Sequence, residues 1–375
     1  MKKIKILYTI PNFNTAGSGI HLLSIVKRLD SDLFEPQIAC IHDLGDYFQE
    51  VKNTGIKIHL IDLYKNVRPL IKMLYECYKL SRIFKQIDPD IIHSYNYTAD
   101  YTEPLAARMA GITWVYTKKN MSWEGPSYRS WRLRSFLANG IIAQNSDMIR
   151  YFFPDCRKAE LIPMGIDINE YKKQSPSNIE KIQWGITEKT RVVISVANLV
   201  PVKGIEILIK AFENLHEKYN HWVLLIVGND MTDYALELKG YLSNKPYLKN
   251  RIIFTGEQKN VRGLLNIAEI YVQPTLNIGR KEGGPIATLE AMANGKVIIG
   301  SNISGIRDQL LEQFPDHLFK AGDTVALESK LDKFMAHSKI ENKKIGDDFI
   351  NFVKKEFDIS IQKMKSELFY QNLTQ

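Results

Sequence analysis

Short runs of aliphatic and β-branched residues recur along the chain, and longer stretches with helically spaced apolar positions separate them. This alternation is typical of a parallel sheet wrapped by helices. A polar stretch that contains proline, KKQSPSNIEK, divides the runs into two series. The first series is IKILYTI, PQIACIH, IKIHLI, DIIHSY, TWVYTK, GIIAQ and AELIPM, and the second is RVVISVA, WVLLIVG, RIIFTG, EIYVQPT and KVIIGS.

The pattern predicts an α/β protein of two doubly wound, Rossmann-like domains that face a cleft. The length of 375 residues supports two domains, because a single hydrophobic core rarely grows beyond about 250–300 residues. We expect the N-terminal domain over residues 1–168 and the C-terminal domain over residues 169–354. Ligands of doubly wound sheets bind at the carboxyl ends of the strands, so the chemistry should lie there.

Composition excludes several classes of protein. The chain is 45% hydrophobic and 25% charged, and no apolar run approaches the ~20 residues that a membrane helix needs. Its first residues, MKKIKILYTIPNF, are interpreted as a strand, since Lys5 interrupts the apolar run and no small-residue cleavage site follows. Three distant cysteines at no metal-ligand spacing favour reduced thiols in a cytosol. We therefore expect a cytoplasmic protein without a metal site at its cysteines. We also expect no nucleic-acid partner.

The net charge of +8 is concentrated in two clusters. Residues 65–85 hold six Lys and Arg against Glu76 alone, and residues 118–134 hold five against Glu124. Such clusters can meet phosphates or an anionic membrane, although solvated helix faces explain the first one equally well. The second mixes arginines with Trp131 and Phe136, so its helix either grips a sugar or lipid phosphate or packs Trp131 and Leu133 inward. The pattern slightly favours an acceptor-side or peripheral membrane role on the inner face of the cell membrane.

The segment RKEGGPIATLEAMANGKVIIGS, residues 280–301, carries the strongest chemical signal. Gly283 and Gly284 let the backbone approach a ligand, and Pro285 suits the first position of the helix that follows. The amides and dipole at a helix start attract anions, so a diphosphate is the expected guest. Glu290, about two turns into that helix, could accept hydrogen bonds from ribose hydroxyls. A plain loop followed by a surface glutamate explains this segment alone equally well.

A second segment, NLVPVKG, favours the ligand site. Lys203 and Gly204 open the next helix at the carboxyl edge of the predicted second sheet. A cation at a helix start opposes the helix dipole, which is a cost without structural gain. We therefore expect Lys203 to neutralise the same diphosphate.

Residues 280–301, the NLVPVKG turn and the segments LLIVGND, LIPMGIDINEY and TAGSGIHLL together resemble the family 4 glycosyltransferases of the GT-B fold over nearly the whole chain. The resemblance implies a retaining glycosyltransferase without an essential metal or other cofactor. Its donor would be a nucleoside diphosphate sugar, UDP- or GDP-linked. The acceptor would be a glycan or a lipid-linked glycan in the synthesis of cell-surface polysaccharide or glycolipid.

The same resemblance implies roles for individual residues. Glu290 would bind the ribose, Glu282 the donor sugar, and Lys203 with the amides after Glu282 the diphosphate. Gly17 would face the phosphates from TAGSGIHLL, which we interpret as a flexible loop with Gly19 as an incidental residue. Residues 355–375 would form the terminal helix that in this fold packs back on the N-terminal domain.

The chain also departs from the family pattern. Asn198, in the donor-binding turn, stands where the family commonly has Arg, so we expect Arg280 or Lys281 to supply the missing charge. Where many members carry His near the reacting sugar, this chain has Lys119 and Asn120. Three further candidates for acceptor or sugar contacts are His93, Trp123 and Arg129.

Two other classes stay open from the residues. A sugar-nucleotide epimerase on the same fold would convert the donor without an acceptor, and a non-catalytic module for sugar nucleotides or glycans would leave the donor intact. An NAD oxidoreductase is not favoured, because the third glycine of a dinucleotide fingerprint would fall at Leu22.

Overall fold

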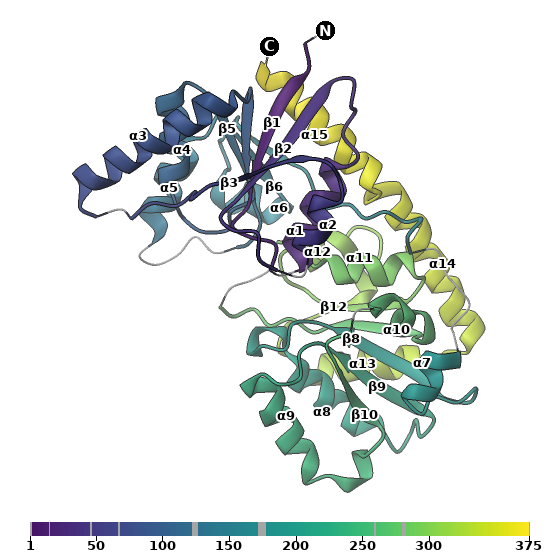
Figure 1. Cartoon of the computed structure of the whole chain (residues 1–375). Helices are drawn as coiled ribbons and strands as arrows, with labels where there is room; N and C mark the ends of the chain where they lie inside the picture. The colour runs from purple at the N-terminus through teal and green to yellow at the C-terminus, as the bar shows by residue number, and fades with distance from the viewer. Residues whose placement is uncertain are drawn as a thin grey trace. The chain divides into compact units, whose positions relative to one another are not determined.

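The computed structural model describes residues 2–14, 16–45, 47–66, 68–121, 127–171, 178–258, 260–279 and 283–374. The chain forms two compact units, of which unit 1 is Met1–Pro163 with Ser360–Gln375 and unit 2 is Met164–Ile359. The sequence placed the corresponding boundaries at 168 and 355. Each unit is a sheet covered by helices (Figure 1).

Unit 1 contains a seven-stranded sheet in the order β3-β2-β1-β4-β5-β6-β7, with every ladder parallel. All seven runs predicted for this half form strands. They are β1 (Ile4–Thr9), β2 (Phe34–Cys40), β3 (Lys57–Leu60), β4 (Ile91–Ser94), β5 (Thr113–Lys118), β6 (Gly140–Ala143) and β7 (Ala159–Leu161). The helices are α1 (Ala16–Val26), α2 (Phe48–Lys52), α3 (Leu70–Ile87), α4 (Thr102–Ala110), α5 (Tyr128–Leu137), α6 (Ser146–Phe152) and α15 (Ile359–Thr374).

Unit 2 contains a six-stranded sheet in the order β10-β9-β8-β11-β12-β13, again parallel. Its strands are β8 (Arg191–Val196), β9 (Trp222–Val227), β10 (Ile252–Gly256), β11 (Ile270–Gln273), β12 (Val297–Ser301) and β13 (Leu318–Phe319). The helices are α7 (Asn178–Gln183), α8 (Ile205–Leu215), α9 (Asp233–Ser243), α10 (Val261–Ile267), α11 (Ile286–Ala293), α12 (Ile306–Leu310), α13 (Thr324–Ala336) and α14 (Lys339–Glu356), with 3-10 turns η2 (Pro201–Lys203), η3 (Pro246–Leu248) and η4 (Pro315–His317).

The strands are nearly continuous apolar runs because helices cover both faces of each sheet. In β8, Val192 and Ile194 enter the core on one face and Val193 enters the core on the other. All six residues of β9 are buried. This two-sided burial explains why the runs in the sequence identify the strands, and it confirms the predicted doubly wound, Rossmann-like architecture.

The C-terminal helix α15 packs on the sheet of unit 1. Tyr8 of β1 donates a hydrogen bond to the hydroxyl of Tyr370 at 3.1 Å. The backbone of Gly140 in β6 leaves the space that Phe369 fills, since a Cβ there would come within 2.6 Å of the Phe369 ring. A glutamate of α15, Glu367, accepts the amide of Asp30 at 2.7 Å. Hydrogen bonds to β1 and a loop, together with packing against β6, therefore fix α15 to unit 1.

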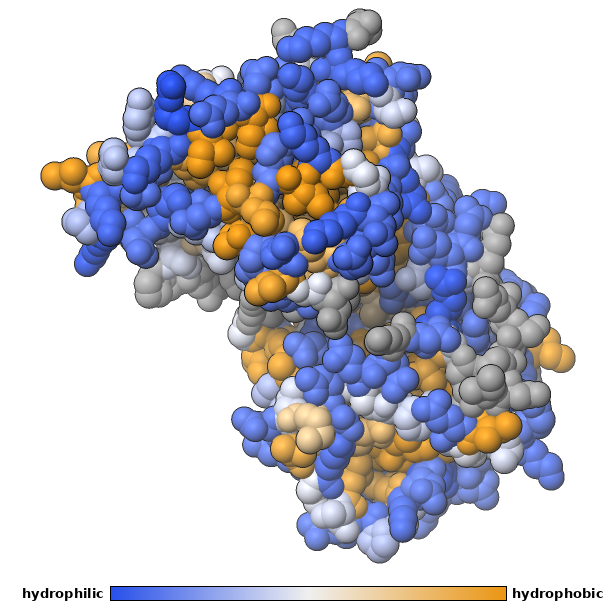
Figure 2. Space-filling model, viewed as in Figure 1, coloured by the Kyte–Doolittle hydropathy of each residue, from blue (hydrophilic) through white to orange (hydrophobic). Residues whose placement is uncertain are grey.

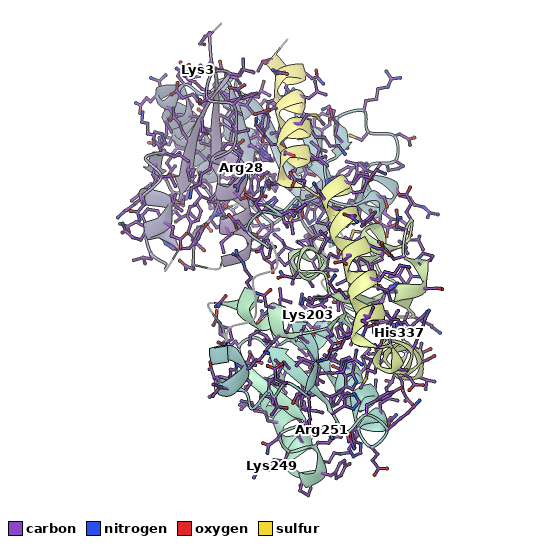
Figure 3. The ribbon with its side chains drawn as sticks, turned by 90° about the vertical axis from the view of Figure 1, so that its right-hand side faces the viewer. Lys3, Arg28, Lys203, Lys249, Arg251 and His337 are labelled. Atoms are coloured by element: carbon purple, nitrogen blue, oxygen red, sulfur yellow. The ribbon has the colours of Figure 1, made fainter. Side chains whose placement is uncertain are left out.

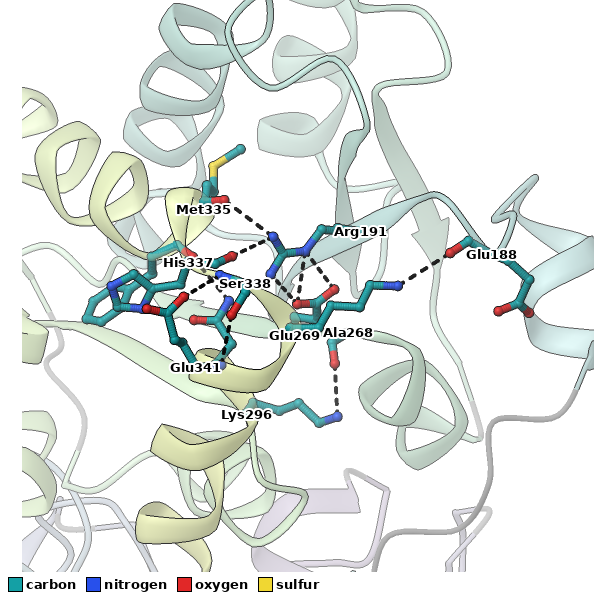
Figure 4. A network of polar contacts seen from close by, with 12 residues as sticks. Glu188, Arg191, Ala268, Glu269, Lys296, Met335, His337, Ser338 and Glu341 are labelled. Carbon is teal, nitrogen blue, oxygen red and sulfur yellow. Dashed lines mark hydrogen bonds and ion pairs between the residues drawn. The ribbon is translucent and has the colours of Figure 1, made fainter.

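A largely buried ion pair, whose Arg191 and Glu269 side chains are 9% and 19% exposed, occupies the amino edge of the unit 2 sheet (Figure 4). The guanidinium of Arg191 at the start of β8 donates to both carboxylate oxygens of Glu269, at 2.9 and 3.0 Å from Nε. The same guanidinium donates to the carbonyl oxygen of His337 at 2.7 Å and lies 4.2 Å from the Trp222 ring centroid. These contacts join two strands to the end of α13, so the charges at this edge serve the fold.

In the described part of the chain, no helix is long and apolar enough to cross a bilayer.

Candidate functional site

The turn after β8 places Lys203 at the carboxyl edge of the unit 2 sheet (Figure 3). Gly204 adopts a left-handed conformation with φ of 64°, and a Cβ there would come within 2.2 Å of the Pro274 carbonyl oxygen. The amide of Leu276 donates to the carbonyl oxygen of Val202 at 2.8 Å. The turn is therefore fastened to the segment that follows β11, and Lys203 has a fixed place on this edge.

Burial lowers the pKa of Lys203. The side chain is half-buried, and desolvation lowers the pKa of its ammonium to about 8. An incoming diphosphate would return the lost electrostatic stabilisation, because an anion nearby favours the charged form. The predicted contact of Lys203 with a diphosphate stays a prediction.

The glycine pair predicted to meet the diphosphate precedes α11. Pro285, predicted at the first helical position, is instead the N-cap, with extended backbone at φ −71° and ψ 118°, so the helix begins one residue later, at Ile286. The carbonyl oxygen of Pro285 accepts a hydrogen bond from the side-chain Nε2 of Gln309 at 3.2 Å. A Cβ on Gly284 would meet no atom closer than 3.9 Å, so the protein leaves open space on that side of the backbone. The start of α11 thus offers the dipole and the room for an anion.

Glu290 projects from α11 and is held by a tyrosine that the sequence reasoning missed. The hydroxyl of Tyr171 donates to Oε1 of Glu290 at 2.7 Å, and the Arg262 guanidinium lies 5.0 Å from the centroid of the Tyr171 ring. Burial raises the pKa of Glu290, and the bond from Tyr171 lowers it. The bond from Tyr171 therefore fixes the direction of the Glu290 carboxylate.

The backbone around Ile166 positions Tyr171. The amide of Ile166 donates to the carbonyl oxygen of Phe357 at 2.9 Å, and its own carbonyl oxygen accepts the amide of Ile359 at 2.9 Å. The buried side chains of Ile166 and Ile168 anchor the same stretch in the core. The aromatic residue that closes LIPMGIDINEY was the signal in the sequence that could have pointed to this contact.

Four predicted site residues lie outside the described residues. They are Trp123, Arg280, Lys281 and Glu282. Asn198 is described and lies exposed in the turn before Lys203. The roles predicted for these residues stay predictions.

The stretch TAGSGIHLL is a helix from Ala16 on, not the flexible loop that the sequence suggested. Leu22 and Leu23 are buried, and this packing outweighs the low helix propensity of the two glycines. Gly17 is exposed in the first turn of α1, and a Cβ there would meet nothing within 4 Å. Gly19 has a packing role, because a Cβ there would come within 2.8 Å of the Phe13 ring; that it plays no part in ligand binding stays a prediction.

His93 lies buried at the carboxyl end of the unit 1 sheet. Its Nδ1 is 2.7 Å from the Tyr370 hydroxyl, and its Nε2 is 2.8 Å from Oγ1 of Thr117. Burial lowers the pKa of His93 to about 3, so the ring is neutral. In this structure His93 joins β4 and β5 to α15, and its predicted contact with an acceptor stays a prediction.

Lys119 and Asn120 follow β5 at the same edge. The ammonium of Lys119 donates to the carbonyl oxygen of Tyr95 at 2.8 Å. It also lies 4.3 Å from the centroid of the Tyr95 ring. Burial lowers the pKa of Lys119 to about 7. The buried Asn120 accepts a hydrogen bond from the Lys118 ammonium at 2.9 Å. Lys119 is thus a second desolvated lysine at a carboxyl edge.

Helix α5 corrects the inward-packing interpretation in part, and its predicted acceptor-side or membrane role stays a prediction. Trp131 is buried as expected, but Leu133 is 39% exposed and the Arg134 side chain is fully buried. Arg134 donates to Oγ of Ser94 at 3.1 Å, and the same hydroxyl donates to the buried carboxylate of Glu103 at 2.7 Å. Arg129 stays exposed on this helix. The sequence missed this buried network because its partners lie far apart along the chain.

Among the described residues, no three His, Cys, Asp or Glu side chains gather as a metal site would need. The prediction that the protein needs no metal is not tested by this finding.

Comparison with known proteins decides the family. The profile of Glycosyltransferase Family 4 matches residues 15–170, and that of Glycosyl transferases group 1 matches residues 177–348. The chain belongs to the family 4 glycosyltransferases. It is therefore a glycosyltransferase, as the motifs predicted.

Curated relatives match most of the chain. It is 24% identical over 327 residues, 82% of each protein, to the UDP-Gal:alpha-D-GlcNAc-diphosphoundecaprenol alpha-1,3-galactosyltransferase of Escherichia coli. It is 23% identical over 323 residues, 84% of this chain and 86% of the relative, to the capsular polysaccharide biosynthesis glycosyltransferase CapH of Staphylococcus aureus.

Solved structures share the fold. A glycosyltransferase of Rickettsia africae superposes with a TM-score of 0.85 at 18% identity, covering 100% of this chain and 99% of that one. Anabaena HepE in complex with UDP and glucose superposes with a TM-score of 0.79 at 20% identity, covering 98% and 99%. The two Rossmann-like units are those of a GT-B glycosyltransferase.

Proposed function

We propose that this glycosyltransferase moves a sugar from a nucleoside diphosphate sugar to a glycan or lipid-linked acceptor, with retention of configuration at the anomeric carbon and without an essential metal. The observation that carries the proposal is the desolvated Lys203. It lies at the carboxyl edge of the unit 2 sheet, the edge from which the chain leads from β11 to α11. Glu290, oriented by Tyr171, stands on that helix.

The reaction breaks the bond between the anomeric carbon and the diphosphate oxygen and forms a bond from that carbon to an acceptor hydroxyl. The departing phosphate takes the proton of that hydroxyl, so attack occurs on the face that the leaving group vacates. Lys203 and the amides at the start of α11 stabilise the charge that develops on the diphosphate. Glu290 accepts hydrogen bonds from the ribose and fixes the donor. Glu282 is assigned to the donor sugar, and Gly17 allows close approach of the phosphates.

UDP is the proposed nucleotide of the donor, in preference to GDP. The name of the Escherichia coli relative specifies UDP-Gal, and HepE was solved with UDP and glucose. The same relative acts on a diphosphoundecaprenol-linked sugar, which supports a lipid-linked acceptor. We accordingly place the protein at the cytoplasmic face of the cell membrane, as a peripheral protein.

An assay of donor consumption tests the proposal. The chain is incubated with UDP- and GDP-sugars, with and without an extract of lipid-linked glycans. Release of the nucleotide is measured, and the sugar of the remaining donor is identified. We expect UDP release that depends on the acceptor. Conversion of the donor to another sugar nucleotide without an acceptor would show the epimerase instead. Binding of the donor without any conversion would show the non-catalytic module.

A further inference from the structure

Helix α3 carries two apolar stripes, of which unit 1 covers one. Met73, Cys77, Leu80 and Phe84 are buried in the unit 1 core. The second stripe stays exposed: Ile71 at 84%, Leu74 at 41%, Tyr75 at 57% and Tyr78 at 55%. Their spacing of i, i+3, i+4 and i+7 puts these four side chains on one face of the helix. We call this exposed set the outer stripe.

Cations border the outer stripe. Lys72 and Lys79 are exposed beside it, while Arg82 and Lys85 continue the same face beyond Tyr78. Glu76 is the acidic residue of this helix, and the Lys79 ammonium lies 3.2 Å from it. The same ammonium lies 4.4 Å from the centroid of the Tyr75 ring. The face therefore combines aliphatic and tyrosine side chains with excess positive charge.

This composition fits a lipid surface. Helices that lie in the bilayer interface bury an aliphatic and aromatic face and set Lys and Arg against the phosphates. Tyrosine is favoured at the level of the headgroups, because its ring is apolar and its hydroxyl is polar. Apolar side chains gather at the tip of unit 1 where Figure 1 draws the start of α3 (Figure 2). Exposed apolar patches of this kind mark contact surfaces.

The charge also decides between occupants. A second copy of the chain seated on the outer stripe would bring two positively charged faces together, which is unfavourable. An anionic bilayer would pair its phosphates with the cations and bury the apolar side chains in the same surface. Helix α5 adds to the same charge in unit 1, since its Arg129 and Arg132 are exposed and Phe136 is 69% exposed.

We propose that α3 docks unit 1 on an anionic lipid bilayer, with Ile71, Leu74, Tyr75 and Tyr78 entering the interface and Lys72, Lys79, Arg82 and Lys85 at the lipid phosphates. The inference rests on the proposed function only in that a lipid-linked acceptor lies in the same surface. Docking itself requires no donor and no turnover.

Vesicle flotation tests the docking. The full chain is mixed with vesicles of phosphatidylglycerol and phosphatidylcholine, or of phosphatidylcholine alone. We expect about tenfold more protein to float with the anionic vesicles, and less as salt is raised. Ile71→Glu with Tyr75→Glu should reduce flotation to the level of phosphatidylcholine alone, and so should Lys72→Glu with Arg82→Glu. Because all four side chains are exposed, these variants are expected to fold, which circular dichroism checks.

The matched control is Ile340→Glu on α14 of unit 2, where the side chain is 82% exposed. This variant should float as the wild type does. Equal flotation of the Ile71→Glu, Tyr75→Glu variant and the wild type would overturn the proposal. So would a wild-type dimer that becomes monomeric in this variant and binds no vesicles, since the stripe would then join two copies.

Transfer assays separate this inference from the proposed function. A docking variant that no longer floats should still release nucleotide with a water-soluble acceptor. A wild type that transfers sugar but binds no anionic vesicles would overturn the docking alone. A wild type that floats but consumes no donor would overturn the proposed function alone.

Discussion

The hydroxyl of Tyr171 sets the direction of the Glu290 carboxylate. A carboxylate that is already oriented loses less freedom when a ribose binds, and this lowers the cost of binding. The ring of Tyr171 keeps its contact with Arg262 whether or not the hydroxyl is present. The hydroxyl and the ring can therefore be tested apart.

Tyr171→Phe removes the hydrogen bond and keeps the ring. The net contribution of such a bond is about 0.5–1.5 kcal/mol, so we expect KM for the donor to rise about 2- to 13-fold with kcat little changed. The matched control is Tyr241→Phe, which removes a 2.7 Å bond to Glu213 on the surface of unit 2. An unchanged KM in Tyr171→Phe would contradict the positioning role.

The two glycines of α1 give opposite expectations. Gly17→Ala adds a methyl group into open space, so the free energy of unfolding should stay within about 0.5 kcal/mol while donor affinity falls. Gly19→Ala puts its methyl group against the Phe13 ring and should destabilise the protein by about 1–3 kcal/mol. Thermal unfolding measures the stability of each variant, and the donor KM measures its donor affinity. Gly17→Ala with wild-type kinetics would remove Gly17 from the site.

If Lys203 binds the diphosphate as proposed, donor binding should depend on pH. Its pKa of about 8 is below the ordinary value, so the ammonium loses its proton as pH rises through 8. A bound diphosphate favours the protonated form, so donor affinity should fall above that pH. Lys203→Arg keeps its charge and should flatten this part of the profile. A wild-type KM that is constant from pH 7 to about 9 would contradict the predicted coupling.

At the scale of elements, we expect the amino edge of the unit 2 sheet to contribute to stability and the carboxyl edge to activity. The amino edge holds the Arg191–Glu269 pair, which ties β8 and β11 to the end of α13. The carboxyl edge holds Lys203, and the segment after β11 leads to α11. The buried pair should therefore affect stability, whereas the charges of the carboxyl edge should affect activity.

Glu269→Ala leaves the Arg191 guanidinium buried without its carboxylate. Breaking a buried pair in this way costs about 3–5 kcal/mol, so the denaturation midpoint of unit 2 should fall clearly. The control is Asp347→Ala, which removes an exposed pair with Lys343 and should change stability by less than about 0.5 kcal/mol. Equal midpoints for the two variants would show that the pair contributes nothing to the fold.

Strand positions could be predicted from the sequence because burial on both faces makes each strand an apolar run. The two-residue β13 is too short to leave such a pattern, and it was missed. The helical start of TAGSGIHLL was missed because buried leucines outweigh local glycine propensity. The burial of Arg134 and the contact between Tyr171 and Glu290 depend on partners distant in the chain, which periodicity does not report.

At the scale of the whole molecule, each unit is a doubly wound sheet, and the predicted chemistry of each gathers at the carboxyl ends of its strands. The described candidates of unit 2, Lys203 and Glu290, belong to elements that follow β8 and β11. Those of unit 1, Lys119 and Asn120, follow β5. The expectation that ligands bind at this edge therefore rests on where these residues lie, and the residue types predict an anionic sugar donor.

The most direct test of the central claim compares kcat/KM for sugar transfer in Lys203→Ala and in the wild type. Lys210→Ala, an exposed lysine on the following helix, is the control. Loss of a charge that stabilises the departing diphosphate costs about 3 kcal/mol, so we predict a decrease of roughly a hundredfold, with Lys210→Ala unchanged. Retention of more than about a tenth of the wild-type value in Lys203→Ala would contradict the account.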